Sequence, residues 1–390
     1  MALVQQILYR TALAELPLDA RCVCHELAQS AARPPARSTM ETRSSVDVQH
    51  TRSEKPPCPM GTPSDFNTAF ERLRAADPVA LARTLETRPE LLSVRDANGK
   101  TLLIHACELA TGNVSIPAVS GSPEQHACVE VLLTHGADPS AAANDGWAPL
   151  HVAAMSGHVG LAHRLIAAGA RREGALLGAR GGSALSLALF YAKRELAEFL
   201  ADPPVPDNLR NAAALGRSLE AFVDGDRLTP NAGDGCDFYR PLLLFPPWQR
   251  SYQRQELLDE ALSWAARNDR CDSMARLVSL GADVNSNAYR GTPLLWAVYA
   301  DRLAAATWLL DHGADPDLRH DFGGVEHGRS AVALHLAAQY NCVNCLRLLL
   351  ERGADPTIRD AAYDATPLGW AEHAGARESA EILRSVGNAK

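Results

Sequence analysis

Residues 146–170 read GWAPLHVAAMSGHVGLAHRLIAAGA, and this stretch decides the fold because related text recurs along the chain. Its first half returns as TPLLWAV at residues 292–298 and as TPLGWAE at residues 366–372. Its second half is a leucine-rich run that ends in glycine and alanine. Self-similarity with a period of about 33 residues is typical of a solenoid built from stacked units.

The triplet Gly-Ala-Asp closes four of these leucine-rich runs and sets the spacing of the units. It begins at Gly136, Gly281, Gly313 and Gly353. From Gly281 to Gly313 is 32 positions and from Gly313 to Gly353 is 40, the excess lying in a glycine-rich loop at residues 320–329. We therefore expect an all-α repeat solenoid of about eight or nine helix-turn-helix units, some degenerate, with short projecting hairpins.

Composition and charge exclude several classes of protein. The chain has 390 residues, 46% of them hydrophobic, and a net charge of −8. An acidic balance argues against a sequence-independent nucleic-acid binder, which needs a basic face. The sequence has no apolar run of about 18 residues, so we expect no membrane span. Nine scattered cysteines favour a reducing, cytoplasmic location over a disulfide framework. We expect a monomer.

Four segments follow one another along the chain. Residues 1–62 have few large apolar side chains and predict a disordered or amphipathic tail, in which the natural start could be Met1, Met40 or Met60. Residues 63–224 form an N-terminal block of units, residues 225–253 an aromatic and proline-rich insertion, and residues 254–387 a C-terminal block. Within the first block, residues 207–223 predict a weak helix pair. We expect a soft junction near residues 225–253.

The repeated residues have local physical reasons. Pro149, Pro293 and Pro367 suit the first position of a helix, where a missing N–H costs nothing. Thr292 and Thr366 precede two of them and can cap the helix. The glycine after each leucine-rich run suits a left-handed helix stop.

These phrases resemble the ankyrin repeat family over roughly residues 66–387. The resemblance rests on the hairpin glycine, the TPLH-like text, the alanine pair and Gly-Ala-Asp, recurring in one order. It implies an L-shaped stack of helix pairs with projecting hairpins, a role in binding proteins, and no shared catalytic residue. Leu295 and Gly369 depart from the usual histidine.

The resemblance also implies where a partner would bind: at the hairpin tips and at the exposed positions after each alanine pair. The positions after the pair are Met155 and Ser156, Tyr299 and Ala300, Gln339 and Tyr340, and His373 and Ala374. The tips are Asp145 and Trp147, Tyr289 and Arg290, Asp321 and Phe322, and Tyr363 and Asp364. For Tyr299 and Tyr340 two interpretations stay open, an interface anchor or a cover over the neighbouring unit. Trp296 and Trp370 fall one position earlier, where the family buries a leucine, and we expect both to be buried.

The insertion at residues 225–253 has two interpretations. So dense an apolar loop must be buried somewhere, and the favoured interpretation is that it packs over its flanking units. The alternative is a binding patch with Phe238, Arg240 and Trp248 as its anchors.

No reaction motif stands out. Cys342 and Cys345 form the one C-x-x-C of the repeat region, but a zinc ribbon needs a second pair, so we expect both to pack in the core. His151, His158 and His335 recur at structural hydrogen-bonding positions of the family. We expect no catalysis, no cofactor and no metal.

Three functional hypotheses follow. The first is a protein-interaction scaffold whose partner is another protein. The second is a dedicated regulator or inhibitor of a single enzyme, or a translocated effector. The third is an enzyme whose site lies in the insertion, and it lacks clustered acid, base and nucleophile.

Overall fold

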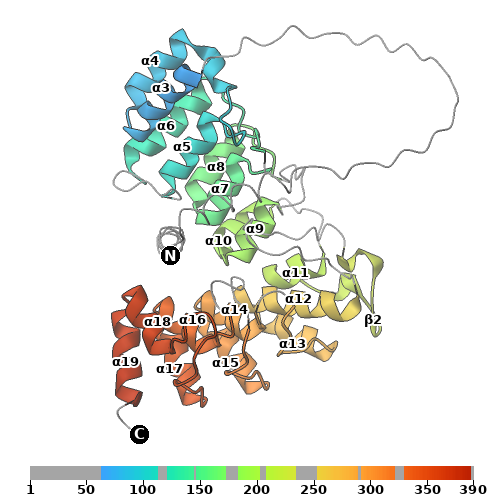
Figure 1. The fold of residues 1–390 in the computed structure, drawn as a ribbon. Helices are drawn as coiled ribbons and strands as arrows, with labels where there is room; N and C mark the ends of the chain where they lie inside the picture. The colour runs from blue at the N-terminus through green and yellow to red at the C-terminus, as the bar shows by residue number, and fades with distance from the viewer. Residues whose placement is uncertain are drawn as a thin grey trace, which may run out of the picture.

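The computed structural model describes residues 63–112, 121–144, 146–172, 183–202, 208–233, 253–288, 291–320 and 329–387. In these ranges short helices stack in two layers (Figure 1). The inner helices are α3 (Pro63–Arg74), α5 (Leu102–Ala110), α7 (Pro149–Ser156), α9 (Ala184–Phe190), α11 (Leu209–Leu215), α12 (Arg254–Arg267), α14 (Pro293–Tyr299), α16 (Ala333–Gln339) and α18 (Pro367–Ala374). The outer helices are α4 (Pro78–Thr87), α6 (Pro123–Thr134), α8 (Val159–Ala167), α10 (Arg194–Leu200), α13 (Cys271–Ser279), α15 (Leu303–Asp311), α17 (Val343–Glu351) and α19 (Arg377–Gly387). Consecutive inner helices pack on one another, which confirms the all-α solenoid.

The inner helices begin as the sequence predicts. Four of them start at a proline, α3 at Pro63 and the other three at the predicted Pro149, Pro293 and Pro367. The Thr292 hydroxyl accepts the backbone N–H of Leu295 at 3.2 Å, and Thr366 caps α18 in the same way. Each cap satisfies an N–H group that the first helical turn leaves without a partner.

The Gly-Ala-Asp triplet forms the turn that leaves the outer helix. Gly136 has a φ of +90°, in the left-handed region that glycine adopts without strain. The Asp138 carboxylate then accepts the backbone N–H of Ser140 at 2.8 Å, and the same bond recurs in the other three triplets. Between units, the Asn285 side chain accepts the backbone N–H of Asp315 at 2.8 Å. The repeated aspartate is therefore a turn former.

The turn from inner to outer helix carries a second bond between units. Asp269 and Asn341 stand there with φ of +60° and +53°. The Asp269 carboxylate accepts the backbone N–H of Ala305 at 2.9 Å, and the Asn341 amide oxygen accepts that of Ser379 at 3.1 Å. Each side chain therefore accepts a backbone N–H group in the first turn of the next unit's outer helix. Aspartate and asparagine also tolerate this backbone conformation better than most residues.

The prediction of a helix pair over residues 207–223 is wrong in its second half. After α11 the chain forms a short 3-10 turn, η2 (Glu220–Phe222), and an antiparallel hairpin of β1 (Val223–Asp224) and β2 (Arg227–Leu228), followed by η3 (Pro230–Gly233). The sequence between the strands is Gly225-Asp226, and two-residue turns of this kind favour a hairpin over a helix. The hairpin crosses the block boundary predicted at residue 224.

The stack bends where α11 lacks an outer helix, and two arms diverge from this point (Figure 1). We call the region where α9, α12 and α14 meet the elbow. Side chains from the second arm donate hydrogen bonds to two carbonyls at the end of α9, Arg267 to Phe190 at 3.3 Å and Asn268 to Leu189 at 2.9 Å. Arg302 donates to the Ala192 carbonyl, in the turn after α9, at 2.8 Å. Helix ends leave such carbonyls without an intrahelical partner, and cations there are favourable.

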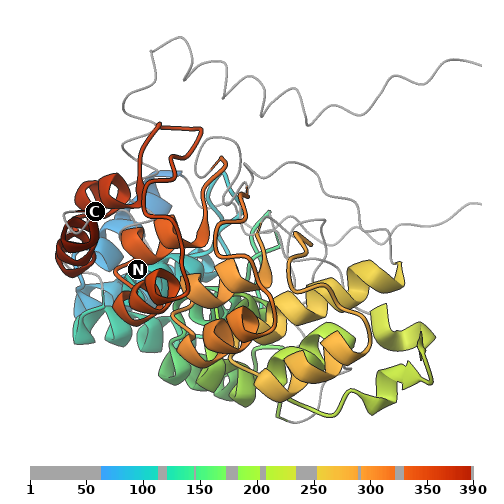
Figure 2. The ribbon, with the colours of Figure 1, turned by 90° about the horizontal axis from the view of Figure 1, so that it is seen from below.

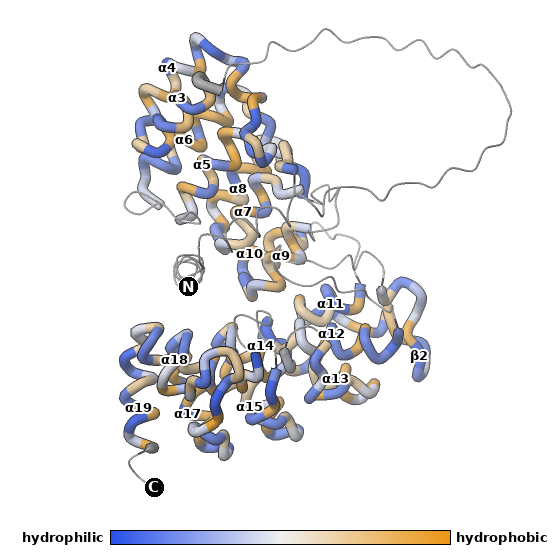
Figure 3. The backbone as a smooth tube through the Cα atoms, in the orientation of Figure 1, coloured by the Kyte–Doolittle hydropathy of each residue, from blue (hydrophilic) through white to orange (hydrophobic). Residues whose placement is uncertain are grey.

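Most of the buried residues are apolar. Along the backbone, apolar residues are frequent in the helices and hydrophilic residues in the loops (Figure 3). Trp296 and Trp370 are buried, as expected. Trp264 and Trp296 belong to the second arm, yet they pack in one continuous cluster with the first arm's core. The core therefore runs through the elbow. In the described ranges, none of the helices combines the length and apolarity that crossing a bilayer requires.

Candidate functional site

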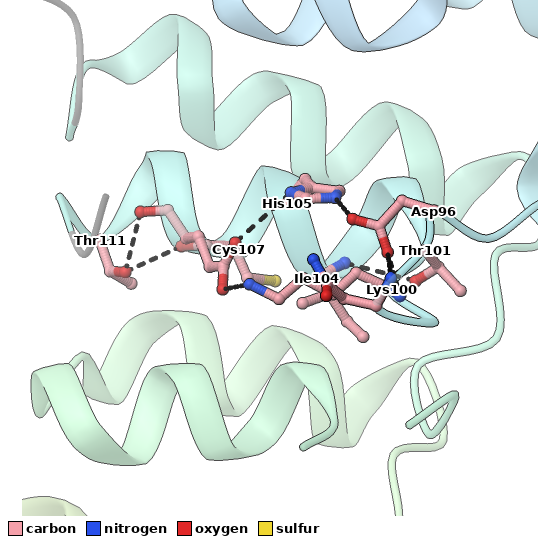
Figure 4. A network of polar contacts seen from close by, with 9 residues as sticks. Asp96, Lys100, Thr101, Ile104, His105, Cys107 and Thr111 are labelled. Atoms are coloured by element: carbon pink, nitrogen blue, oxygen red, sulfur yellow. Dashed lines mark hydrogen bonds and ion pairs between the residues drawn. The ribbon is translucent and has the colours of Figure 1, made fainter. Parts of the chain in front are cut away.

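A group of ionisable side chains surrounds His105 on α5 (Figure 4). Its Nε2 lies 3.0 Å from an Asp96 carboxylate oxygen, and its Nδ1 lies 3.4 Å from Glu108. The Lys100 ammonium donates to Glu108 at 2.6 Å. Burial raises the pKa of Glu108, but the hydrogen bond from His105 and the Lys100 charge outweigh it and leave that pKa below its usual value.

An Asp–His pair of this kind could in principle serve as a general base, but its neighbours favour a structural role. The second Asp96 oxygen accepts the backbone N–H groups of Asn98 and Lys100, at 2.9 and 2.8 Å, which fixes the hairpin before α5. The nearest thiol, Cys107, is buried, and burial raises its pKa far above the usual value. A thiol held protonated is a poor nucleophile. The network therefore joins hairpin to helix.

The recurring histidines act as the family resemblance implies. The Nδ1 atoms of His151 and His335 accept the backbone N–H groups of Ala148 and Val332, at 3.1 and 3.2 Å. His158 caps α8 by accepting from Leu161 at 3.0 Å. These imidazoles hold helix starts.

Cys342 and Cys345 are both buried in the core, as expected. Burial raises the pKa of Cys342 to about 12, and it raises the pKa of Cys345 further. Both thiols therefore stay protonated and pack as small apolar groups.

The predicted interface positions fall into four groups. Phe238, Arg240, Trp248, Tyr289 and Arg290 lie outside the described residues, as do Asp145, Asp321 and Phe322. His373 is exposed on α18, whereas Met155 and Trp147 are half-buried. Tyr299 and Gln339 are buried.

The burial of Tyr299 and Tyr340 supports the packing interpretation. Tyr299 is only 8% exposed, and its ring meets that of Tyr340 edge-on at a centroid distance of 5.1 Å. Burial raises the pKa of Tyr340, and Tyr299, Cys342 and Tyr191 add to this rise. Because Tyr191 follows α9, a side chain of the first arm lies near Tyr340 of the second.

The sequence did not reveal the cationic and aromatic cluster at the elbow. The Arg267 guanidinium is 1% exposed and lies 3.9 Å from the ring centroid of Trp296 and 4.5 Å from that of Phe190. Arg210 lies 4.1 Å over the ring of Trp264 and pairs with Glu260 at 2.9 Å. Desolvated guanidinium groups over aromatic faces stabilise contacts by about 2 kcal/mol.

An exposed aromatic side chain lies in the connection between α17 and α18. Tyr363 is 59% exposed at its tip, as expected for a hairpin tip position. The connection projects from the helix layers on the same side as the other hairpins (Figure 2). Exposed tips and inner helices thus form one face of the molecule.

Comparison with known proteins agrees with this architecture. The sequence matches the family described as ankyrin repeats (3 copies) over residues 116–210 and 241–320, and the single ankyrin repeat over residues 331–361. It is 41% identical over 96 residues to protein PhlB of Serratia liquefaciens, covering 25% of this chain and 39% of that protein. It is 34% identical over 111 residues to the E3 ubiquitin-protein ligase HACE1 of Xenopus tropicalis, covering 28% of this chain and 11% of the ligase. A match to the putative palmitoyltransferase ZDHHC13 of Danio rerio, 31% identical over 106 residues, covers 25% of this chain and 15% of that protein. The chain thus spans well under half the length of these relatives.

Proposed function

Because the chain belongs to the ankyrin repeat family, we propose that it is a non-catalytic scaffold that binds proteins through its hairpin and inner-helix face. The observation that carries this proposal is the placement of the hairpins, which project to one side of the helix layers (Figure 2). Such a face offers a large contact area on a frame that is already ordered, so binding requires little further loss of conformational entropy.

The reactive side chains support a non-catalytic role. His105, His151, His158 and His335 bond to turns and helix starts, and the buried thiols hold their protons. Within the described ranges Cys107, Cys128, Cys271, Cys342 and Cys345 are all free thiols. Thiols persist in reducing compartments, so we place the protein in the cytoplasm. Its net charge of −8 supports the further proposal that it does not bind nucleic acid.

Site-specific photo-cross-linking in the native cell tests the proposal. A photoreactive amino acid at position 373, on the hairpin face, should form protein adducts that mass spectrometry identifies. The matched control stands at Leu303, which is exposed on the outer helix α15. Equal adducts at both positions, or none at position 373, would remove the support for this face.

The same experiment separates scaffold from regulator. A scaffold should give several different protein adducts from the hairpin face. A dedicated regulator, or an effector with one target, should give a single adduct whose catalytic activity changes when the purified chain is added.

A further inference from the structure

The connection between α17 and α18 is held in one conformation by Asp360. One carboxylate oxygen accepts the backbone N–H groups of Ala362 and Tyr363, at 2.8 and 2.7 Å. The other accepts the N–H of Ala365 at 3.1 Å and the indole N–H of Trp370 at 2.9 Å. A loop fixed by four bonds to one buried carboxylate is ordered before any partner arrives.

This fixed loop presents an aromatic side chain to solvent. Among the phenylalanine, tryptophan and tyrosine side chains that the structure describes, Tyr363 is the one that is largely exposed to solvent. The other large apolar side chains exposed in this way, Val79 and Leu303, lie on outer helices. A rigidly held, exposed tyrosine is a typical anchor of a protein interface.

Three arginines surround this loop. Arg319 donates to the Arg359 carbonyl at 2.8 Å and to the Ser330 carbonyl at 3.1 Å, and the Arg329 carbonyl accepts the N–H of Ala361 at 2.8 Å. All three arginine side chains are exposed.

Their positive charge is neutralised only in part. Arg359 lies 3.5 Å from the Asp364 carboxylate. In the described part of the chain, neither Arg319 nor Arg329 belongs to an ion pair; Asp321 and Glu326 of the intervening segment lie outside that part. A positive site on a chain of net charge −8 selects for a partner that carries negative charge close to this site.

We propose that this hairpin edge, made of Arg319, Arg329, Arg359 and Tyr363, binds an acidic segment of a partner protein next to an apolar residue. The inference rests on the proposed function and adds the chemistry of the partner. Guanidinium groups bind carboxylates in a bidentate manner, and the tyrosine ring supplies the apolar contact. Three cations on an acidic protein neutralise too few phosphates for stable binding of nucleic acid.

The test uses peptides selected on the full-length chain from a random phage-displayed library. The selected peptides should be enriched in Asp and Glu beside a Leu, Phe or Trp. Fluorescence anisotropy with a synthetic copy of the best peptide should show about 30-fold weaker binding to Tyr363→Ala and about 10-fold weaker binding to Arg329→Ala. Because both side chains are exposed, neither variant should alter the thermal midpoint.

The matched control is Arg377→Ala, an exposed arginine on α19, which should leave the affinity unchanged. Peptides without acidic enrichment, affinity that Tyr363→Ala and Arg329→Ala do not change, or displacement by a short single-stranded DNA would each overturn the proposal. The scaffold proposal is tested separately, by the cross-linked adducts at position 373. If those adducts form while the peptide experiment fails, only the proposal about the acidic partner is overturned.

Discussion

At the residue scale, the junction between neighbouring units depends on one position in the turn from inner to outer helix. Asn341 adopts a left-handed backbone there and caps α19 through Ser379. Two free-energy terms therefore act at one site. The cap contributes about 1 kcal/mol, and the left-handed conformation costs a residue such as alanine about 1 kcal/mol.

Substitutions at Asn341 should separate these two terms. Asn341→Ala loses the cap and adopts a strained backbone, so the free energy of unfolding should fall by about 2 kcal/mol. Asn341→Gly loses only the cap, so its free energy of unfolding should fall by about 1 kcal/mol. Urea denaturation followed by circular dichroism measures both, and equal losses would show that backbone strain plays no part.

His320 should make the stability of the protein depend on pH. Burial lowers the pKa of His320 to about 3, whereas an unfolded histidine has a pKa of about 6.5. Between these values the unfolded chain binds a proton that the folded chain excludes. The stability is therefore complete above about pH 6.5 and is lost as the pH falls toward 3.

Urea titrations between pH 7 and 4.5 measure this dependence. His320→Gln should reduce the slope by up to about 1.4 kcal/mol per pH unit, the value for one proton. His373→Gln, at an exposed histidine, is the control and should leave the slope unchanged. Equal pH dependence of the free energy of unfolding in all three proteins would contradict the assignment to His320.

At the scale of elements, the elbow shows where prediction from sequence reaches its limit. Local signals such as Pro293, Thr292 and Gly313 act within one unit, and they gave the helix starts and turns correctly. The bond from Arg267 to the Phe190 carbonyl joins residues 77 positions apart. The alanine pair before Arg267 indicates from the sequence that Arg267 lies on the inner side of α12. Only the bend of the stack brings α9 next to it, and the sequence does not predict that bend.

Arg267 should contribute strongly to stability through this long-range contact. Arg267→Ala leaves a cavity between Phe190 and Trp296 and removes donors from buried carbonyls, so unfolding should become easier by about 3 kcal/mol. Arg267→Met keeps most of the volume and should lose about half as much. Chemical denaturation measures both, with Arg377→Ala as an exposed control. Equal losses for Ala and Met would assign the whole effect to the guanidinium group, through its hydrogen bonds and aromatic contacts.

At the scale of the molecule, the two arms contact each other at the elbow as well as being joined along the chain. The elbow contacts come from α9, α12, α14 and the turn before α15, all within the described ranges. The soft junction between the blocks, expected near residues 225–253, stays a prediction. The arms are joined a second time through space.

A protease site introduced within residues 234–252 tests this second connection. After cleavage the two fragments should still co-elute in size-exclusion chromatography. With Arg267→Ala and Arg302→Ala combined, the cleaved fragments should co-elute less completely, because the bonds to Phe190 and Ala192 are lost while the packing of α11 on α12 and the Arg210–Glu260 pair remain. Separation of the fragments of the otherwise unchanged protein would show that these contacts together cannot hold the arms.

The elbow also limits how a chain of this kind can change in length. Its contacts join α9 to α12 and α14 across the single inner helix α11, so a unit inserted beside α11 would move Phe190 out of reach of Arg267. At the outer ends of the arms each unit meets one neighbour through the same turns and caps, and an added unit would disturb no distant contact. Growth by duplication is therefore open at the two ends of the array and closed at its middle.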